Sequence, residues 1–240
     1  MIELLTYGDQ GWGDEMLRGA GMTVAVALLA YAFGIVVGMA GAAGKVGGGS
    51  VLRGVLDVYT TVVRGVPELL VIYLLFFGLS SAVMKVASVF GYTGYIEVDN
   101  FVIGVLAVGL ISGAYSTEVF RGALQAIPNG QIEAGRAVGM TGWQIFHRIQ
   151  LPQMLRLALP GLGNIWQLTL KDTALISVTG LAELMRMSRV AAGATHQPFT
   201  FYLAAAALYL VMTTFSQTAF QRAERHFSRS VRTASGQPAP

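Results

Sequence analysis

Five ionisable side chains lie within or at the ends of the long apolar stretches of this 240-residue chain: Arg64, Glu68, Glu118, Lys171 and Asp172. The chain is 54% hydrophobic and only 12% charged, which is about half the charged fraction of an ordinary soluble domain. In a membrane each such charge costs roughly 2.5–3.5 kcal/mol on insertion scales. Charges at that depth usually face a partner or a water-filled path, so these five are candidates for binding a polar solute.

Arg64 and Glu68 flank Pro67. Proline lacks a backbone N–H and disfavours helix at Val66, so we predict a break in the apolar segment at this point. Backbone groups that the break frees can line a cavity. A structural ion pair between Arg64 and Glu68 near the inner end of the segment explains the same residues equally well.

Lys171 and Asp172 are neighbours in the chain, so on a helix they point about 100° apart and cannot fully face each other. At least one of them must therefore meet another group. Glu118 and Arg121 lie three residues apart near the end of another apolar segment. That spacing favours a local ion pair.

Residues 132–152, IEAGRAVGMTGWQIFHRIQLP, form an amphipathic stretch between two apolar segments. The GMTG sequence at 139–142 predicts a break between two short helices. Trp143, Phe146 and Ile149 follow at intervals of three, which suits one face of a helix. A helix pair of this kind can lie on a membrane surface or dock into a groove on another protein, and the residues alone favour neither.

The apolar segments predict an all-α membrane bundle, because about 20 mostly apolar residues cross a bilayer as a helix. The five expected spans are Gly21–Ala43, Val55–Leu79, Phe101–Val119, Leu155–Val178 and Phe199–Phe220. Basic residues of short loops favour the cytoplasmic side. With the N-terminus outside, ten loop Lys and Arg residues fall inside, and those left outside are Arg18, Lys85, Arg186 and Arg189.

This orientation predicts an extracytoplasmic segment 1–18, a membrane domain 19–222 with a cytoplasmic loop at about 128–152, and a cytoplasmic tail 223–240. Two glycine pairs, Gly34 with Gly38 and Gly109 with Gly113, have the spacing that lets membrane helices approach closely. Glycine is also simply common in membrane helices, so a specific packing role and a compositional origin both remain open.

The loop resembles the signature of ABC importer permeases. It has Glu133-Ala134-Gly135, three residues, Gly139, nine residues, and Ile149-Gln150-Leu151-Pro152, with Gly135 in place of a second alanine. The resemblance implies that the loop forms coupling helices that seat in a cleft of a separate cytoplasmic ATPase subunit. The residues it assigns to coupling are Glu133, Ala134, Gly139, Phe146, Leu151 and Pro152.

Further segments resemble the polar amino-acid branch of these permeases, the one for arginine, histidine, ornithine and opines. They are 64–68, 113–118, 120–123, 159–164, 170–175 and, for arginine permeases in particular, 197–200. The resemblance implies alternating access in a bacterial inner membrane. It also implies a second permease subunit, related or identical, two ATP-binding subunits, an extracytoplasmic solute-binding protein and surrounding lipid as partners, with no nucleic acid.

A cationic amino acid carries cationic groups and a carboxylate. We expect Asp172 first and Glu68 second to accept the cationic groups, and Arg64 or a freed backbone donor to meet the carboxylate. Four further residues are candidates to line the path: Asn164, Trp166, Gln167 and Thr173. A packing or lipid-facing role explains Trp166 equally well.

No nucleotide site is expected on this chain. The nearest glycine-rich candidate, Gly41 to Val46, has Met39 where a phosphate-binding loop needs glycine and Val46 where it needs Ser or Thr. A basic turn that leaves the first span explains Lys45 better. ATP and Mg²⁺ are therefore expected on the partner ATPase, with no cofactor bound by this chain.

The sequence has no cysteine, and its histidines are scattered at His147, His196 and His226, so we expect no metal site. No nucleophile–base set supports a membrane enzyme. A self-contained ion-coupled transporter or channel is the alternative from another class. It would explain the buried charges without ATP and would not need the loop.

Overall fold

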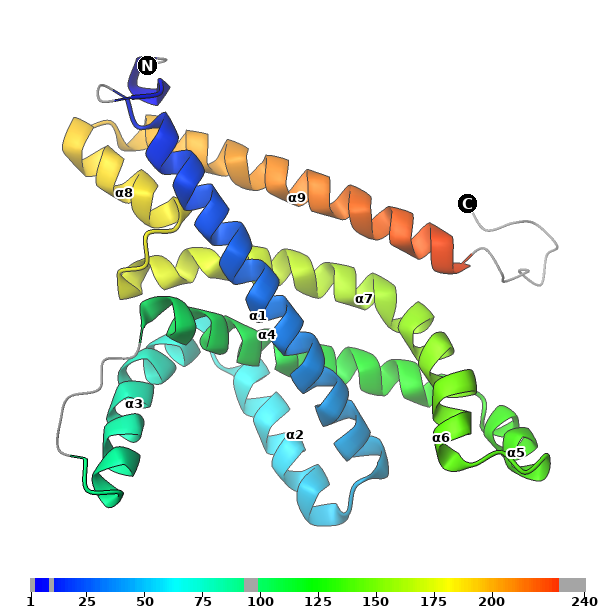
Figure 1. Ribbon diagram of the computed structural model, residues 1–240. Coiled ribbons are helices and arrows are strands. Elements are labelled where there is room, and N and C mark those ends of the chain that lie inside the picture. Colours follow the sequence, from blue (N-terminus) through cyan, green and yellow to red (C-terminus); the bar gives the residue numbers. More distant parts are fainter. Residues whose placement is uncertain (1–2, 9–10, 93–98, 229–240) are drawn as a thin grey trace.

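The computed structural model describes residues 3–8, 11–92 and 99–228 and contains helices and no strand in these ranges (Figure 1). Its elements are the 3₁₀-helix η1 (Glu3–Leu5), α1 (Gly13–Gly47), α2 (Ser50–Gly65), α3 (Glu68–Val89), α4 (Asn100–Gln125), α5 (Asn129–Ala137), α6 (Gly142–Ile145), the π-helix η2 (Phe146–Gln150), α7 (Leu151–Asp172), the 3₁₀-helix η3 (Thr173–Thr179), α8 (Leu184–Thr195) and α9 (Pro198–Ser228).

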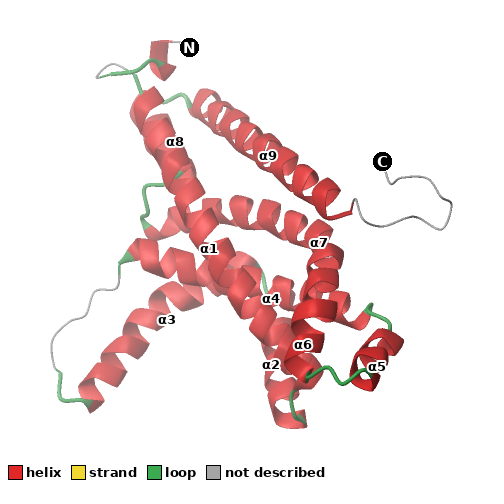
Figure 2. Cartoon of the chain, turned by 45° about the vertical axis from the view of Figure 1, so that its right-hand side comes forward, coloured by secondary structure: helices red, strands yellow, loops and turns green. Residues whose placement is uncertain are grey.

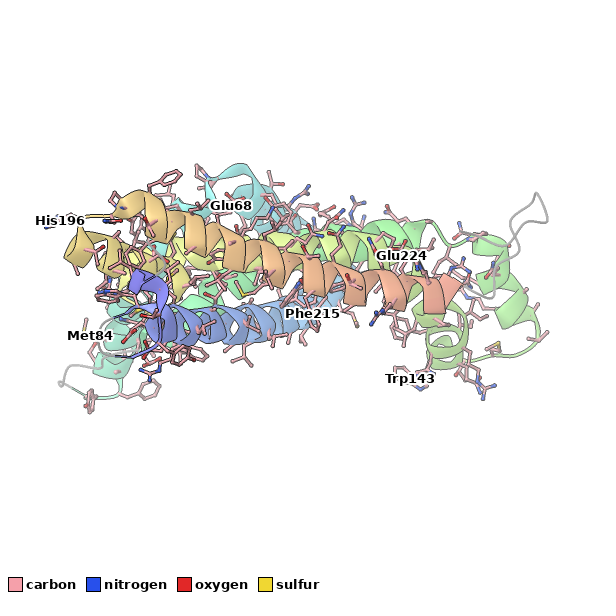
Figure 3. The ribbon with its side chains drawn as sticks, turned by 90° about the horizontal axis from the view of Figure 1, so that it is seen from above. Glu68, Met84, Trp143, His196, Phe215 and Glu224 are labelled. Atoms are coloured by element: carbon pink, nitrogen blue, oxygen red, sulfur yellow. The ribbon has the colours of Figure 1, made fainter. Side chains whose placement is uncertain are left out.

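The bundle is elongated and has two ends (Figure 3). His196 and Met84 lie at one end, and Trp143 and Glu224 lie toward the other. The short helices α5 and α6 project from this second end (Figure 1). The long helices run between the two ends, so a movement of α5 and α6 at one end can be transmitted along them to the other end.

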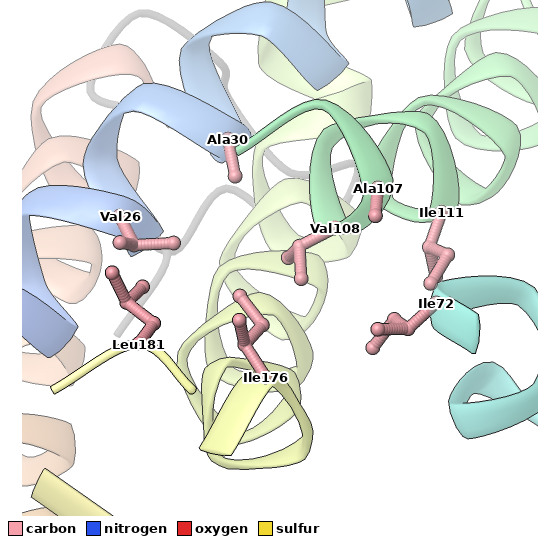
Figure 4. Packing of buried hydrophobic residues seen from close by; sticks show 8 residues of the cluster. All are labelled: Val26, Ala30, Ile72, Ala107, Val108, Ile111, Ile176 and Leu181. Atoms are coloured by element: carbon pink, nitrogen blue, oxygen red, sulfur yellow. The ribbon is translucent and has the colours of Figure 1, made fainter. Parts of the chain in front are cut away.

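The helix α4 lies at the centre and packs most extensively on α1. One apolar cluster joins α1, α3, α4, the 3₁₀ segment η3 and the loop that follows it (Figure 4). Its members are Val26, Ala30, Ile72, Ala107, Val108, Ile111, Ile176 and Leu181. Of the elements that carry the candidate charged residues, α4 carries Glu118, and the other three, α2, α3 and α7, all pack on α4.

Small residues set the distance between α1 and α4. A Cβ atom on Gly34 would lie 2.6 Å from Ser112 Oγ, and one on Gly109 would lie 2.6 Å from Phe33 Cδ1. A Cβ atom on Gly113 would lie 2.8 Å from Val37 Cγ1. The two glycine pairs thus pack into each other's helices, which confirms the specific packing role over the compositional one.

Replacing Gly38 by valine is expected to destabilise the bundle by about 1–3 kcal/mol, the usual range for overpacking. A Cβ atom there would meet Ser116 Cβ and lie 2.9 Å and 3.0 Å from the backbone atoms Ser116 C and Thr117 N, which cannot move aside as a flexible side chain can. Thermal unfolding of the purified protein in detergent measures the change. Gly21→Val is the matched control, because Gly21 lies on the same helix with no atom within 4 Å of its added Cβ. Equal melting temperatures for the two variants would contradict the packing role.

Among the described residues, four helices are long and apolar enough to cross a membrane: α1, α3, α4 and α9, the last over Pro198–Arg225. The helix α7 is less apolar because it carries the polar residues Gln153, Arg156, Asn164, Gln167 and Lys171. The observed helices extend beyond the predicted spans, and α1 already begins at Gly13, within the segment 1–18 expected to precede the bundle.

The prediction for the second span was wrong in its bounds. The structure has two helices there, with α2 starting at Ser50 and α3 continuing to Val89. The start was missed because α2 is amphipathic. Polar residues interrupt its valines, so its first residues do not form a continuous apolar stretch that would indicate a membrane span. The end was missed because α3 carries small polar residues in its second half, which a helix in lipid tolerates when their hydroxyls bond to the preceding turn, as Ser81 does to the Phe77 carbonyl oxygen.

The helix α8 was not predicted. Glu183 caps it by accepting hydrogen bonds from the N–H groups of Met185 and Arg186 at 2.8 Å and 2.6 Å. The Glu183 side chain is fully buried, and the hydroxyls of Thr23 and Tyr209 also donate to it. Burial raises the pKa of this carboxyl, against the lowering effect of the hydrogen bonds. The capped end of α8 is thereby tied to α1 and α9. Residues 229–240 of the predicted tail, with Arg229 and Arg232, lie outside the described residues.

Candidate functional site

The helical segment is broken at Val66 and Pro67, between α2 and α3, as predicted. Val66 has extended backbone angles, φ −107° and ψ 142°, and Pro67 has φ −53° and ψ 131°. No side chain caps the first turn of α3. The N–H groups of Leu70 and Val71 donate to the Pro67 carbonyl oxygen. The N–H groups of Glu68 and Leu69 are therefore available to an anionic group, which a helix N-terminus attracts.

Arg64 and Glu68 do not form an ion pair with each other but share a third residue, Tyr115 of α4. The Arg64 guanidinium carbon lies 5.5 Å from the centre of the Tyr115 ring. The Tyr115 hydroxyl donates to Glu68 Oε1 at 3.2 Å. The structural-pair interpretation of Arg64 and Glu68 is thus replaced by an arrangement in which one tyrosine of α4 contacts both the cation and the carboxylate.

Asp172 and Lys171 face different surroundings, as their helical spacing requires. Asp172 ends α7 and lies within electrostatic range of Glu68 and Tyr115. Lys171 lines an apolar cavity of about 370 Å³ beside α8 and α9, together with Met185 and Tyr202. The two carboxylates Asp172 and Glu68 are brought to one region, so a cation between them would relieve their repulsion. We call Arg64, Glu68, Tyr115 and Asp172 the break cluster.

Asn164 and Thr173 are not brought to the break cluster. Asn164 lies on a cavity of about 200 Å³ between α7 and α9, next to Gln167 and Glu224. Thr173 is fully buried, and its hydroxyl donates to the Leu170 carbonyl oxygen at 2.7 Å. Adjacent positions on a helix point in different directions, so Thr173 faces away from the side that Asp172 occupies.

A second polar group, which sequence analysis did not assemble, lies toward the end that carries α5 and α6. Lys45 is 7% exposed, and its Nζ lies 2.7 Å from Asp57 Oδ1, 2.7 Å from Glu118 Oε1 and 2.6 Å from Thr60 Oγ1. The predicted pair of Glu118 with Arg121 is confirmed at 2.7 Å. Lys45 thus holds α1, α2 and α4 together rather than serving only as a basic turn.

The predicted two-helix loop is confirmed as α5 and α6. The helix α5 ends at Ala137, and Gly139 follows its C-cap with a φ of +80°, in the left-handed region. The Gly139 N–H donates to the Arg136 carbonyl oxygen at 3.0 Å, and the Met140 N–H donates to that of Gly135 at 3.0 Å. These two bonds form a Schellman stop, which favours glycine at this position because it has no Cβ. The signature glycine therefore has a backbone role in shaping the loop.

The helix α6 starts with a capping box. Thr141 Oγ1 accepts from the Gln144 N–H at 3.3 Å, and Gln144 Oε1 accepts from the Thr141 N–H at 2.8 Å. Ile145 is buried and faces α5, where Gly135 leaves room for it: a Cβ atom on Gly135 would lie 3.2 Å from Ile145 Cγ1. The departure from the signature at Gly135 thus brings the two short helices close together.

The loop leaves an exposed apolar edge. Trp143 is 70% exposed and Val138 is 77% exposed. Trp143 contacts the rings of Phe146 and His147, so the three aromatic side chains form one patch. Glu133 and Ala134 are exposed on α5 and Pro152 on the first turn of α7, while Leu151 packs partly against the core. A projecting, exposed aromatic edge of this kind is suited to a groove on another protein.

Residues 30–229 match the family model described as binding-protein-dependent transport system inner membrane component. The chain belongs to this family. The match includes the break cluster, the Lys45 group and the loop, so all three lie within the permease domain. Together with its relatives, it identifies the chain as an ABC importer permease of the polar amino-acid family.

The similar proteins cover almost the whole permease. The nopaline transport system permease protein of Agrobacterium fabrum is 53% identical over 96% of this chain and 98% of its own length. An octopine transport system permease protein of Rhizobium meliloti is 52% identical over 96% and 98%. The histidine/lysine/arginine/ornithine transport system permease protein of Escherichia coli is 40% identical over 93% and 98%.

Solved structures share the permease fold. A crystal structure of an amino acid ABC transporter with histidines matches with a TM-score of 0.76 and 32% identity, over 90% of this chain and 95% of that chain. An inward-facing methionine ABC transporter matches with a TM-score of 0.71 at 19% identity, over 89% and 96%. The second of these supports the fold alone.

Proposed function

We propose that this permease imports cationic amino acids or opines across a bacterial inner membrane. The observation that carries the proposal is the break cluster. Arg64 and Glu68 contact one tyrosine, and a second carboxylate, Asp172, lies within electrostatic range of Glu68 and of that tyrosine. Such a set suits a solute that has two cationic groups and a carboxylate. Relatives for nopaline, octopine and basic amino acids point to the same solute class.

In this proposal Asp172 and Glu68 accept the cationic groups of the solute. The Arg64 side chain and the uncapped first turn of α3 receive its carboxylate. Tyr115 orients Glu68 through its hydroxyl. Asn164 would contact solute only on a later part of the path, since its cavity lies between α7 and α9.

The proposed topology has five crossings, with the N-terminus outside and the C-terminus in the cytoplasm. The chain runs between the two ends of the bundle along α1, along α2 with α3, along α4, along α7 with η3, and along α9 (Figures 1 and 3). The basic residues of α5, η2 and the end of α9 would face the cytoplasm, in line with the positive-inside rule.

The proposed assembly contains a second permease subunit, two ATP-binding subunits and an extracytoplasmic solute-binding protein. ATP and Mg²⁺ would be bound by the ATP-binding subunits, with α5 and α6 seated in them. ATP binding would then shift the permease between outward and inward access through this contact. The two access states of the permease would thus be coupled to two states of the ATP-binding subunits.

Uptake by proteoliposomes that hold the complete complex tests the proposal. We expect ATP-dependent accumulation of radiolabelled arginine that excess histidine, octopine or nopaline reduces and excess glutamine does not. Accumulation without ATP would contradict the ABC mechanism. Preferential competition by glutamine would contradict the solute class.

A further inference from the structure

The helices α1, α2 and α4 pack on one another (Figure 2). A cavity of about 500 Å³ lies beside the break cluster, between the end of α1, the polar face of α2 and the second half of α4. The charged residues that line it are Lys45, Arg53, Asp57, Arg64, Glu118 and Arg121. It lies toward the proposed cytoplasmic end, and Arg64 belongs both to this cavity and to the break cluster. Its volume is in the range of small-molecule sites.

The charges in this cavity are unevenly satisfied. Both oxygens of Glu118 are occupied, one by Lys45 and the other by Arg121. Arg53 Nε donates only to the Lys45 carbonyl oxygen, at 3.1 Å. Within the described part of the chain, neither Arg53 nor Arg64 lies within ion-pair distance of an acidic side chain. Two guanidinium groups thus face the cavity without a carboxylate.

Asp57 supplies the complementary charge. Its Oδ1 accepts from Lys45, while its side chain is 57% exposed toward the cavity. A free carboxylate oxygen and two unpaired guanidinium groups therefore lie around one space. An oxyanion and a primary ammonium on one small molecule match this arrangement, because guanidinium binds carboxylate through two parallel hydrogen bonds and carboxylate accepts from ammonium.

We propose that this cavity is a second binding site for the imported amino acid, which it occupies on the cytoplasmic side after leaving the break cluster. The α-carboxylate binds Arg53 and Arg64, and the α-ammonium binds Asp57. The choice of ligand rests on the proposed function. Arg64 links the two sites, since the same guanidinium faces both.

The second site differs from the break cluster in selectivity. The break cluster has two carboxylates for the cationic groups of a solute, whereas Glu118 is already neutralised by two cations. No second free carboxylate among the described lining residues remains for a cationic side chain. The second site should therefore bind the α-amino acid group itself and accept arginine and glutamine with similar affinity.

Equilibrium binding of radiolabelled arginine and glutamine to the nucleotide-free complex in phosphatidylcholine nanodiscs tests this inference. With Asp172→Asn present to weaken the break cluster, we expect a residual component that both amino acids occupy. Adding Asp57→Asn or Arg53→Gln should weaken that component at least about tenfold, as expected for loss of a charged hydrogen bond. Lys45 keeps its bonds to Glu118 and Thr60 in these variants, so the three helices stay joined.

Asp99→Asn and Arg222→Gln are the matched controls and should leave the residual component unchanged. Asp99 caps α4 outside the cavity, and Arg222 is exposed on α9. Absence of a residual component, or a component that Asp57→Asn and Arg53→Gln do not alter, would overturn the inference. In either case ATP-driven uptake by the wild-type complex would still stand, so the failure would be distinct from failure of the proposed function.

A phosphatidylethanolamine headgroup has the same oxyanion and ammonium and is the competing source. Mass spectrometry of lipid that copurifies with the complex separates the two. If phosphatidylethanolamine is retained by the wild-type complex and lost from Asp57→Asn, and amino acids do not displace it, the site belongs to lipid and the amino-acid assignment is overturned. Displacement of labelled arginine by glutamine without any change in bound lipid supports the assignment.

Discussion

Replacing Asp172 by asparagine is expected to lower the apparent affinity for arginine in ATP-driven uptake by about 10- to 100-fold. A hydrogen bond to a charged group contributes about 1.5–3 kcal/mol, and about 1.4 kcal/mol corresponds to a tenfold change. Asparagine keeps the size of the side chain but removes the charge that would attract the cationic group of the solute. The measurement is the concentration of arginine at half-maximal uptake by proteoliposomes that contain the whole complex.

Two further variants separate charge from shape. Asp172→Glu retains the charge and should recover part of the affinity, which a purely structural role at the end of α7 would not predict. Asp99→Asn removes a carboxylate elsewhere but keeps an oxygen that can accept from the first turn of α4, where Asp99 now caps Phe101 and Val102. It should leave uptake unchanged. If arginine uptake by Asp172→Asn equals that of the wild type, Asp172 does not contact the solute.

Local chemistry made some features predictable from the sequence. The break at Val66 and Pro67 follows from what proline does to its own N–H and to the preceding residue, and it needs no knowledge of the fold. The stop at Gly139 and the short helix after it follow from local signals of the same kind. The pair of Glu118 with Arg121 is set by helical spacing alone. Each of these depends on residues within one turn or one helix.

Features that join distant segments were not predictable in the same way. Tyr115 contacts both Arg64 and Glu68, although it is about 50 positions away in the sequence. The contacts of Lys45 with Asp57 and Glu118 need the folded positions of three helices. The spacing of Tyr115 and Glu118 does place them near one face of a helix, a signal that such a face is polar. The partner of that face could be known only from the packing.

The helix α8 illustrates a different limit. Its sequence has few apolar residues in a row and carries Arg186 and Arg189, so it has the appearance of a loop between two spans. Its cap, Glu183, would be read as a surface residue, yet it is fully buried because α1 and α9 supply hydroxyl donors. Burial of a carboxylate is favourable only when such partners are present, and they come from residues 23 and 209.

Replacing Gly139 by valine is expected to uncouple ATP hydrolysis from transport while the membrane helices remain folded. The φ of +80° at this position costs a residue with a Cβ about 1–2 kcal/mol, and a β-branched residue rarely adopts it at all. The Schellman bonds to Arg136 and Gly135 would be lost or displaced. The angle between α5 and α6 would then change, and with it the exposed edge formed by Val138 and Trp143.

The loop has its own control in Gly142, which starts α6 with an ordinary negative φ and has no atom within 4 Å of an added Cβ. Gly142→Ala should retain uptake. For Gly139→Val we expect at least about a tenfold loss of arginine uptake. A loss of about 1.4 kcal/mol in the binding of the loop to the ATP-binding subunit is enough to produce that change. Stimulation of ATPase activity by the solute-binding protein should fall in parallel, whereas thermal stability of the complex in detergent should change little. If α5 and α6 transmit the motion of a separate ATPase to the membrane helices, a change in the angle between them must reduce that transmission. Normal uptake by Gly139→Val would therefore mean that the shape of this loop does not carry the coupling.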